Sequence, residues 1–171
     1  MPLRIREAEA RDVPSIASIH IRAWQAAYRG QLDDAYLDAL DVEERIGQTR
    51  SMIEEAPPEF RSWIAEDGAD VVGFAVTGPS QDADAEKKTG ELYAIYLEPE
   101  RVGTGVGRTL FEHALADLVE RGFTGATLWI LESNALGRRF YEAAGWTPDG
   151  TTASEHVDTE MRSTIRYRAP F

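Results

Sequence analysis

The chain has 171 residues, a formal net charge of −12 at pH 7 and no cysteine. Its length suffices for a domain with a hydrophobic core, which we expect to be a single domain over residues 1–171. The lack of cysteine excludes disulfides, thiolate catalysis and cysteine-bound zinc, and the negative charge argues against a nucleic-acid-binding protein.

The first half of the chain is expected to contain a strand, three helices and a β-hairpin. Asp12 is a suitable N-cap for the long first helix, Gly30 follows the end of that helix, and Asp67-Gly68 is typical of a hairpin turn. In chain order these elements are predicted at residues 3–8, 12–28, 32–40, 42–55, 60–66 and 71–77.

The second half is expected to alternate strands with helices before a final hairpin. Gly122 and Gly145 follow the two predicted helices, where glycine favours the turn that ends a helix. The polar, acidic segment at residues 78–88 is expected to be a mobile loop. The remaining elements are predicted at residues 91–97, 105–121, 126–131, 134–144 and 146–171, the last range holding two strands.

The sequence shows no sign of a targeting segment, a membrane span or a metal site. Residues 1–6 do not resemble a signal peptide, and no apolar run is long enough to span a bilayer. His20, His113 and His156 are far apart and lack metal-ligand spacing. We therefore expect a cytoplasmic protein with no metal and with neither nucleic acid nor membrane as a partner.

Three glycines alternate with other residues at the start of the helix predicted over residues 105–121. Gly103, Gly105 and Gly107 lack a Cβ, so several main-chain N–H groups can turn toward one point. The helix adds its own free N–H groups and the positive end of its dipole. This arrangement predicts an anion site that is built from backbone and is well suited to a pyrophosphate.

Two other glycine motifs fit this segment poorly. A P-loop needs a lysine followed by serine or threonine, whereas Gly107 is followed by Arg108 and Thr109. A dinucleotide fingerprint reads G-x-G-x-x-G near the start of a βαβ unit, whereas these glycines read G-x-G-x-G past the middle of the chain. A helix start without any ligand remains as the alternative, and it would bear the cost of ordering three glycines.

Two parts of the sequence together resemble the GCN5-related N-acetyltransferase (GNAT) family. They are residues 92–111, and residues 132–134 (Glu-Ser-Asn) with 140–146 (Phe-Tyr-Glu-Ala-Ala-Gly-Trp). The glycine loop is similar to the family's Gln/Arg-x-x-Gly-x-Gly/Ala pattern, although Val102 stands at the usual Gln/Arg position. The resemblance implies an α/β fold with a mixed, mostly antiparallel and twisted sheet of about seven strands, flanked by helices and splayed in the middle.

The resemblance also implies acetyl-CoA as co-substrate. The amides of the glycine loop are expected to hold its pyrophosphate, and the strand at residues 91–97 is expected to pair with its pantetheine arm. A main-chain N–H near Ile95 is expected to polarise the thioester carbonyl. Four arginines flank the two motifs and suit a small anionic ligand: Arg101, Arg108, Arg138 and Arg139. The predicted cofactor-binding residues are Ile95, Tyr96, Leu97, Val102, Gly103, Thr104, Gly105, Val106, Gly107, Arg108, Asn134 and Arg138.

Tyr141 is the predicted general acid. Asn134 and Tyr141 are seven residues apart and so share one face of a helix, while Leu136 and Phe140 are expected to face the core. The resemblance assigns Asn134 to the pantetheine chain and Tyr141 to the leaving sulfur, to which its phenol would donate a proton. In the alternative interpretation, Tyr141 only packs, with its hydroxyl at the surface.

Glu91 is the predicted general base, because an amine acceptor is mostly protonated at neutral pH and must lose that proton before it attacks. It begins an apolar strand, whose alternation is expected to place it on the same face as Tyr93 and Ile95. A solvated glutamate at the start of a strand is the alternative. Glu132 and Glu66 are weaker candidates for the base.

The resemblance implies an acceptor site that involves Trp24, Tyr28 and Tyr93. Trp24 and Tyr28 are four residues apart on one helical face, where they form either an aromatic wall for an alkylammonium group or part of the core. The net charge suits a cationic acceptor, although an acidic host explains it equally well. Further aromatic or imidazole side chains expected near this site are Tyr36, Phe74 and His156.

These observations predict an N-acetyltransferase that moves an acetyl group from acetyl-CoA to a primary amine by direct attack in a ternary complex. The acceptor is expected to be a small molecule or a protein N-terminal or lysine amine, and the resemblance favours a homodimer. The alternatives are a non-catalytic acyl-CoA sensor and a nucleotide-binding regulator.

Overall fold

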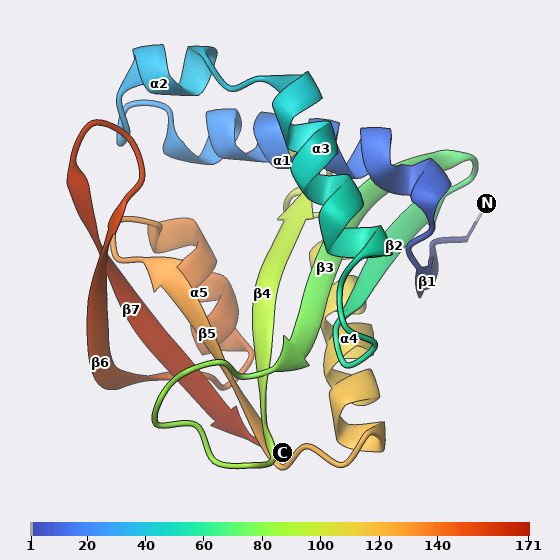
Figure 1. The fold of residues 1–171 in the computed structure, drawn as a ribbon, viewed down its shortest axis with the longest axis vertical. Helices are drawn as coiled ribbons and strands as arrows, with labels where there is room; N and C mark the ends of the chain where they lie inside the picture. The colour runs from blue at the N-terminus through green and yellow to red at the C-terminus, as the bar shows by residue number, and fades with distance from the viewer. Residues whose placement is uncertain (1) are drawn as a thin grey trace.

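The chain folds around one seven-stranded β-sheet (Figure 1). The computed structural model describes residues 2–171; Met1, which the predicted domain range includes, lies outside the described residues. The strands are β1 (Arg4–Glu7), β2 (Arg61–Asp67), β3 (Asp70–Pro79), β4 (Thr89–Leu97), β5 (Gly125–Leu131), β6 (Thr147–His156) and β7 (Met161–Pro170). Their order is β1-β2-β3-β4-β5-β7-β6, with β4 and β5 parallel and the other neighbours antiparallel. This confirms the predicted mixed, mostly antiparallel sheet.

The helices lie close to their predicted positions. They are α1 (Val13–Tyr28), α2 (Asp34–Asp38), α3 (Val42–Glu54), α4 (Val106–Glu120) and α5 (Ala135–Ala143), with short 3-10 helices η1 (Ala10–Asp12) and η2 (Pro99–Arg101) that the sequence did not reveal. α2 is shorter than predicted, because the side chain of Asp33 caps its start and the helix ends before Ala39. Within residues 2–171 no helix is both long and apolar enough to cross a membrane.

The helices cover the two faces of the sheet as separate layers (Figure 1). α4 and α5 pack on one face, where the largest buried side chains include Leu110, Phe111, Leu118, Leu128, Trp146 and Tyr167. α1, α2 and α3 lie on the other face, over two smaller clusters that contain Ile16, Ile19, Phe74, Leu37 and Leu131. We call these the α4 face and the α1 face.

β4 and β5 pair over only three residues and then separate. The pairs are Thr89 with Gly125, Gly90 with Ala126, and Glu91 with Thr127. Both strands continue well beyond these pairs, and Figure 1 shows their far ends diverging. The predicted splay of the middle strands is therefore present, and it begins directly after Glu91.

A bulge in β4 changes which of its side chains share a face. The register with β3 shifts between Val76 and Thr77, so that Val76 pairs with Ala94, Thr77 pairs with Leu92, and Tyr93 is the extra residue. Tyr93 packs on the α1 face and Ile95 on the α4 face. The prediction that these two share a face was wrong, because a one-residue bulge inverts the alternation that follows it.

Candidate active site

The start of α4 leaves main-chain N–H groups unpaired. Side chains cap three other helices at their first residues, namely those of Asp33, Asp41 and Asn134. α4 instead follows Gly105, whose φ of 92° is left-handed, and in the described part of the chain no side chain caps it. The N–H groups of Val106, Gly107 and Arg108 are therefore directed outward at the positive end of the helix dipole, where an anion can accept from them.

The turn before α4 also requires glycine. Gly103 has a φ of 80°, and a Cβ at Gly103 or Gly105 would meet no atom within 4 Å, so the backbone here is open to a ligand. The N–H groups of Val102 and Thr104 each donate to a carbonyl three residues earlier, at 3.3 Å. Within the predicted loop, the N–H groups best placed for an anion are thus those of the glycines and the first turn of α4.

The arginines beside this turn are paired with acidic side chains. Arg101 contacts Asp67 at 2.7 Å, and Arg108 contacts Glu112 at 3.4 Å with both side chains largely exposed. Such surface pairs contribute little free energy, but each acidic partner offsets the positive charge of its arginine. The charge that the site offers an anion therefore comes mainly from the backbone.

Asn134 and Arg138, both predicted to bind the cofactor, already have partners in the chain. The Oδ1 of Asn134 accepts the N–H of Gly137 at 2.9 Å, and its Nδ2 donates to the Tyr28 hydroxyl at 3.0 Å. Arg138 donates to the Tyr167 hydroxyl and to the main-chain carbonyl of Glu132, each at 3.1 Å. A role for either residue at the pantetheine arm must share or replace these contacts.

Three phenols from three elements lie near one another around the splay. Tyr141 of α5 is 9% exposed, and burial raises the pKa of its phenol, with further upward contributions from Tyr96 of β4 and Tyr28 of α1. Burial likewise raises the pKa of Tyr28 and of Tyr96. Tyr141 is therefore protonated throughout the physiological pH range and can donate a hydrogen bond.

The predicted apolar face of α5 is only half correct. Phe140 packs against the core of the α4 face, as predicted. Leu136 is 57% exposed, which contradicts the prediction. Gly137 occupies the position against the sheet instead, since a Cβ there would lie 2.7 Å from Ile130, and the neighbouring Leu136 consequently faces outward.

Glu91 is buried at the point where β4 and β5 separate. The residue is only 6% exposed, and its Oε2 accepts a hydrogen bond from the Ser80 hydroxyl at 3.2 Å. Burial raises the pKa of the Glu91 carboxyl group and the negative charge of Asp82 raises it further, while the bond from Ser80 opposes both. A carboxylate that is reluctant to stay ionised is suited to accept a proton.

The weaker base candidates have different surroundings. Glu66 accepts hydrogen bonds from Arg6 at 2.9 and 2.6 Å, and these bonds lower the pKa of its carboxyl group. Glu132 is exposed. Of the three carboxylates, Glu91 is therefore the one that is both buried and shifted to a higher pKa.

The predicted acceptor residues lie on the α1 face. The rings of Trp24 and Tyr28 are 4.8 Å apart, but Tyr28 is 4% exposed and belongs to the core, which favours the packing interpretation for that residue. Among residues 2–171, the buried indole N–H of Trp24 has no hydrogen-bond partner. Tyr93 donates from its hydroxyl to the carbonyl of Pro79 at 2.5 Å.

The other three residues named for this site are scattered. Phe74 is 1% exposed in the core, Tyr36 is half-buried beside Tyr28, and His156 is exposed at the end of β6. The described residues contain no group of three histidine, aspartate or glutamate side chains that could hold a metal ion.

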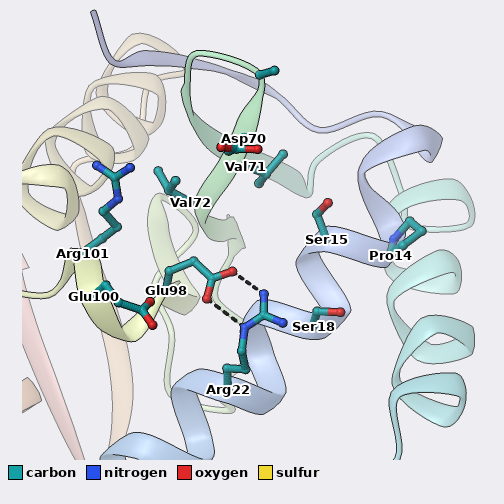
Figure 2. Close-up of a pocket in the computed structure, with 11 residues that line it drawn as sticks. Pro14, Ser15, Ser18, Arg22, Asp70, Val71, Val72, Glu98, Glu100 and Arg101 are labelled. Atoms are coloured by element: carbon teal, nitrogen blue, oxygen red, sulfur yellow. Dashed lines mark hydrogen bonds and ion pairs between the residues drawn. The ribbon is translucent and has the colours of Figure 1, made fainter. Parts of the chain in front are cut away.

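A cavity of about 510 Å³ lies beside the glycine loop, and none of the predicted site residues lines it (Figure 2). It is lined by α1, the turn between β2 and β3, and the segment that leads from β4 into η2. Figure 2 shows Arg22 of α1 directed at Glu98, whose Oε2 accepts from Nε at 2.9 Å. This pair anchors the segment before the glycine loop to α1.

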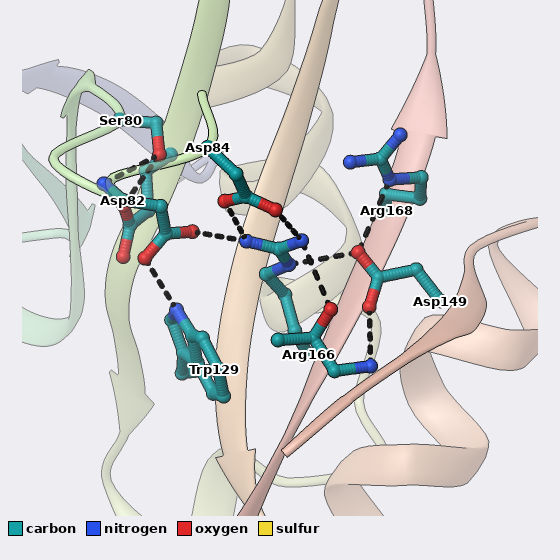
Figure 3. A network of polar contacts seen from close by, with 9 residues as sticks. Ser80, Asp82, Asp84, Trp129, Asp149, Arg166 and Arg168 are labelled. Carbon is teal, nitrogen blue, oxygen red and sulfur yellow. Dashed lines mark hydrogen bonds and ion pairs between the residues drawn. The ribbon is translucent and has the colours of Figure 1, made fainter. Parts of the chain in front are cut away.

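Sequence reasoning missed a buried arginine. Arg166 of β7 is 3% exposed and contacts aspartates of both β6 and the loop between β3 and β4 (Figure 3). In the sequence, Arg166 stands between Ile165 and Tyr167 on one strand, so it is expected to face the opposite side of the sheet from them. Because its partners lie far away in the chain, that pattern alone did not reveal the contacts.

Comparison with known proteins identifies relatives of this chain. Residues 15–146 match the model of the acetyltransferase (GNAT) family. An uncharacterized N-acetyltransferase of Bacillus subtilis is 33% identical over 131 residues, covering 76% of this chain and 72% of the relative. A probable N-acetyltransferase of Mycobacterium tuberculosis is 30% identical over 161 residues, covering 88% and 83%. Among solved structures, the PaiA N-acetyltransferase of Thermoplasma acidophilum in complex with coenzyme A superimposes with a TM-score of 0.79 at 19% identity, covering 100% of both chains.

Proposed function

Because this chain belongs to the acetyltransferase (GNAT) family, we propose that it transfers an acetyl group from acetyl-CoA to a primary amine in a ternary complex. The single observation that supports this best is the combination of an uncapped helix start with a splay between β4 and β5. The first suits a pyrophosphate and the second leaves strand backbone free for an amide-bearing arm.

The residues present fit acetyl-CoA as co-substrate. Coenzyme A is bound in the PaiA structure, and we propose that this chain binds the same carrier. The N–H groups of Gly103, Gly105 and the first turn of α4 would hold its pyrophosphate, and the backbone of Ile95, Tyr96 and Leu97 would pair with its pantetheine arm. When bound, acetyl-CoA supplies an activated acyl thioester.

Glu91 acts as the general base in this proposal. Its position at the base of the splay, together with its raised pKa, suits it to remove a proton from the incoming ammonium group, directly or through a water. A main-chain N–H near Ile95 stabilises the negative charge that develops on the acyl oxygen, as a fixed donor that needs no reorganisation.

Tyr141 acts as the acid. Burial keeps its phenol protonated but also makes it a weaker acid than an exposed tyrosine. It therefore assists first by donating a hydrogen bond to the departing sulfur, and transfers its proton as negative charge accumulates there.

The acceptor is a small amine, or an N-terminal or lysine amine of a protein, and the acidic chain favours a cationic one. Trp24 and Tyr93 on the α1 face are the acceptor-side residues of this proposal, with Tyr28 supporting them from the core. We place the protein in the cytoplasm, as a single domain that forms a homodimer and has neither nucleic acid nor membrane as a partner.

Release of free CoA from acetyl-CoA over a panel of amines tests the function. Turnover with at least one amine, abolished in Glu91→Gln, is the expected result. Tight binding of acetyl-CoA without turnover on any amine would instead favour a non-catalytic acyl-CoA sensor. Calorimetric binding of ATP or NAD in place of acetyl-CoA would favour a nucleotide-binding regulator.

A further inference from the structure

The Arg166 side chain joins segments that are far apart in the sequence (Figure 3). Its Nε donates to Asp149 at 2.7 Å, and its Nη1 donates to Asp82 at 3.1 Å. Two further bonds bind Asp84, at 2.6 and 2.7 Å, and Nη2 also donates to Thr151 at 3.0 Å. We call these five residues the Arg166 clamp.

The Arg166 clamp ties together the two halves of the splayed sheet. Asp82 and Asp84 belong to the loop that precedes β4, whereas Arg166 and its other partners belong to β7 and β6. Main-chain pairing between the halves consists of three residues of β4 that contact β5 and, just before them, the bond from the N–H of Thr124 to the carbonyl of Lys88. The clamp is thus a second connection, on the α1 face, next to where the strands separate.

A continuous chain of hydrogen bonds leads from the Arg166 clamp to Glu91. Asp82 accepts from Arg166 through Oδ2 and from the indole N–H of Trp129 through Oδ1, the latter at 3.0 Å. The main-chain N–H of Asp82 donates to Ser80 Oγ at 3.3 Å, and Ser80 Oγ donates to Glu91 Oε2 at 3.2 Å. The main chain of Ser80 is held separately, by its N–H bond to the carbonyl of Thr89 at 2.9 Å. The contact from Asp82 therefore orients the Ser80 hydroxyl and, through it, the Glu91 carboxylate.

The sheet itself places no charge beside Glu91. Its neighbour on β3 is Gly78 and its neighbour on β5 is Thr127, neither of which is ionisable. Tyr93 on the same strand is a phenol whose pKa is raised, so it is neutral at physiological pH. The charged group that acts on Glu91 is Asp82, and the cation that offsets Asp82 is Arg166.

We infer that Arg166 is a positioning residue for Glu91: it holds Asp82, which orients the Ser80 hydroxyl, and it sets the charge that the Glu91 carboxylate faces. This inference rests on the proposed role of Glu91 only for its effect on the rate. The loop that the sequence suggested to be mobile is, at Asp82 and Asp84, fixed to the sheet.

Substitutions on the two sides of the ion pair should move the pKa of Glu91 in opposite directions. Asp82→Asn removes a negative charge near Glu91, so we expect its pKa to fall by about 0.5–1 unit. Arg166→Met removes the offsetting cation and leaves the aspartates, so we expect the pKa to rise by a similar amount. A role confined to stability would not produce opposite signs.

Carbon-13 NMR titration of the Glu91 carboxyl group in the full chain measures this pKa directly, with Glu91→Gln to assign the signal. The acid limb of kcat/KM, measured with one amine, should shift in the same directions, since the pKa of the substrate is common to every variant. Arg6→Met is the matched control: like Arg166, Arg6 is a mostly buried arginine that pairs with three carboxylates, but it lies on β1 at an outer edge of the sheet. It should reduce stability without shifting the Glu91 titration.

Opposite shifts in Asp82→Asn and Arg166→Met support the inference, and no shift, or shifts of one sign, would overturn it. If Arg166→Met does not fold, Arg166→Gln replaces it, because glutamine removes the positive charge but keeps a hydrogen-bond donor for the aspartates; the pKa of Glu91 should again rise, and an unchanged or lowered pKa would overturn the inference. The proposals that this inference accompanies fail separately. Full turnover in Glu91→Gln would show that Glu91 is not the base, and absence of turnover by the unsubstituted chain with every amine would refute acetyl transfer, whatever the NMR titration shows.

Discussion

Substitution of Gly105 by glutamate tests the anion site at the start of α4. The residue has a φ of 92°, where a side chain costs about 1–2 kcal/mol of folding free energy. The new carboxylate lies where we propose the pyrophosphate, and two like charges about 5 Å apart repel by about 1–3 kcal/mol at a protein surface. At about 1.4 kcal/mol per tenfold change, the Kd for acetyl-CoA should rise about 5- to 140-fold.

Gly122→Glu provides the matched control. Gly122 follows the other end of α4, has a φ of 90°, and like Gly105 has open space where a Cβ would be. A carboxylate is unfavourable near that end of the helix dipole and favourable near the start, so Gly105→Glu should be the more stable of the two variants. Lost binding in Gly105→Glu therefore cannot be attributed to unfolding.

Isothermal calorimetry with acetyl-CoA measures the Kd, and thermal unfolding followed by circular dichroism measures stability. Gly105→Ala, which adds strain without charge, should weaken binding less than Gly105→Glu. An unchanged Kd in Gly105→Glu would show that the phosphates bind elsewhere, and an equal loss in Gly122→Glu would show that the effect is not local.

Four other residues give separate predictions. Tyr141→Phe should lower kcat by about 10²- to 10⁴-fold with little change in the calorimetric Kd, and an unchanged kcat would remove Tyr141 from catalysis. Since Glu91 must be ionised to accept a proton, kcat/KM should decrease as pH falls through its raised pKa; a profile flat down to the ordinary glutamate pKa would contradict this. Asn134→Ala should reduce unfolding free energy by about 0.5–2 kcal/mol, and Asn134→Asp by less because it retains the cap, as urea denaturation can measure. Burial lowers the pKa of His20 to about 4, so below pH 6.5 the unfolded chain binds more protons than the folded chain. The free energy of unfolding should therefore fall by up to about 3 kcal/mol between pH 6.5 and 4, and His20→Gln should reduce this dependence.

The order of helices and strands could be predicted because the sequence patterns that indicate them are local. Hydrophobic periodicity, helix caps and glycines at turns lie within one element, so the order of helices and strands followed from short segments such as residues 91–97 and 105–121. The uncapped start of α4 could be anticipated for the same reason, since Gly105 and the residues around it are contiguous.

The remaining features depend on partners that belong to other elements of the fold. The bulge at Tyr93 arises from the register between β3 and β4, and the outward direction of Leu136 from the close approach of Gly137 to Ile130. The burial of Arg166 depends on a loop more than 80 residues earlier, as the separation of Arg166 from Asp84 shows. No pattern within one segment encodes these contacts.

If acetyl-CoA binds in the splay as proposed, the short junction between β4 and β5 limits the space open to its acyl chain. At Glu91 and Thr127 the strands are joined at the ordinary spacing of about 4.8 Å, which leaves no room between them. An acyl chain that extends toward this junction would collide with the main chain of the two paired strands. Discrimination against longer thioesters would then reside in the backbone of the sheet, and exchanging side chains around the opening would not relax it.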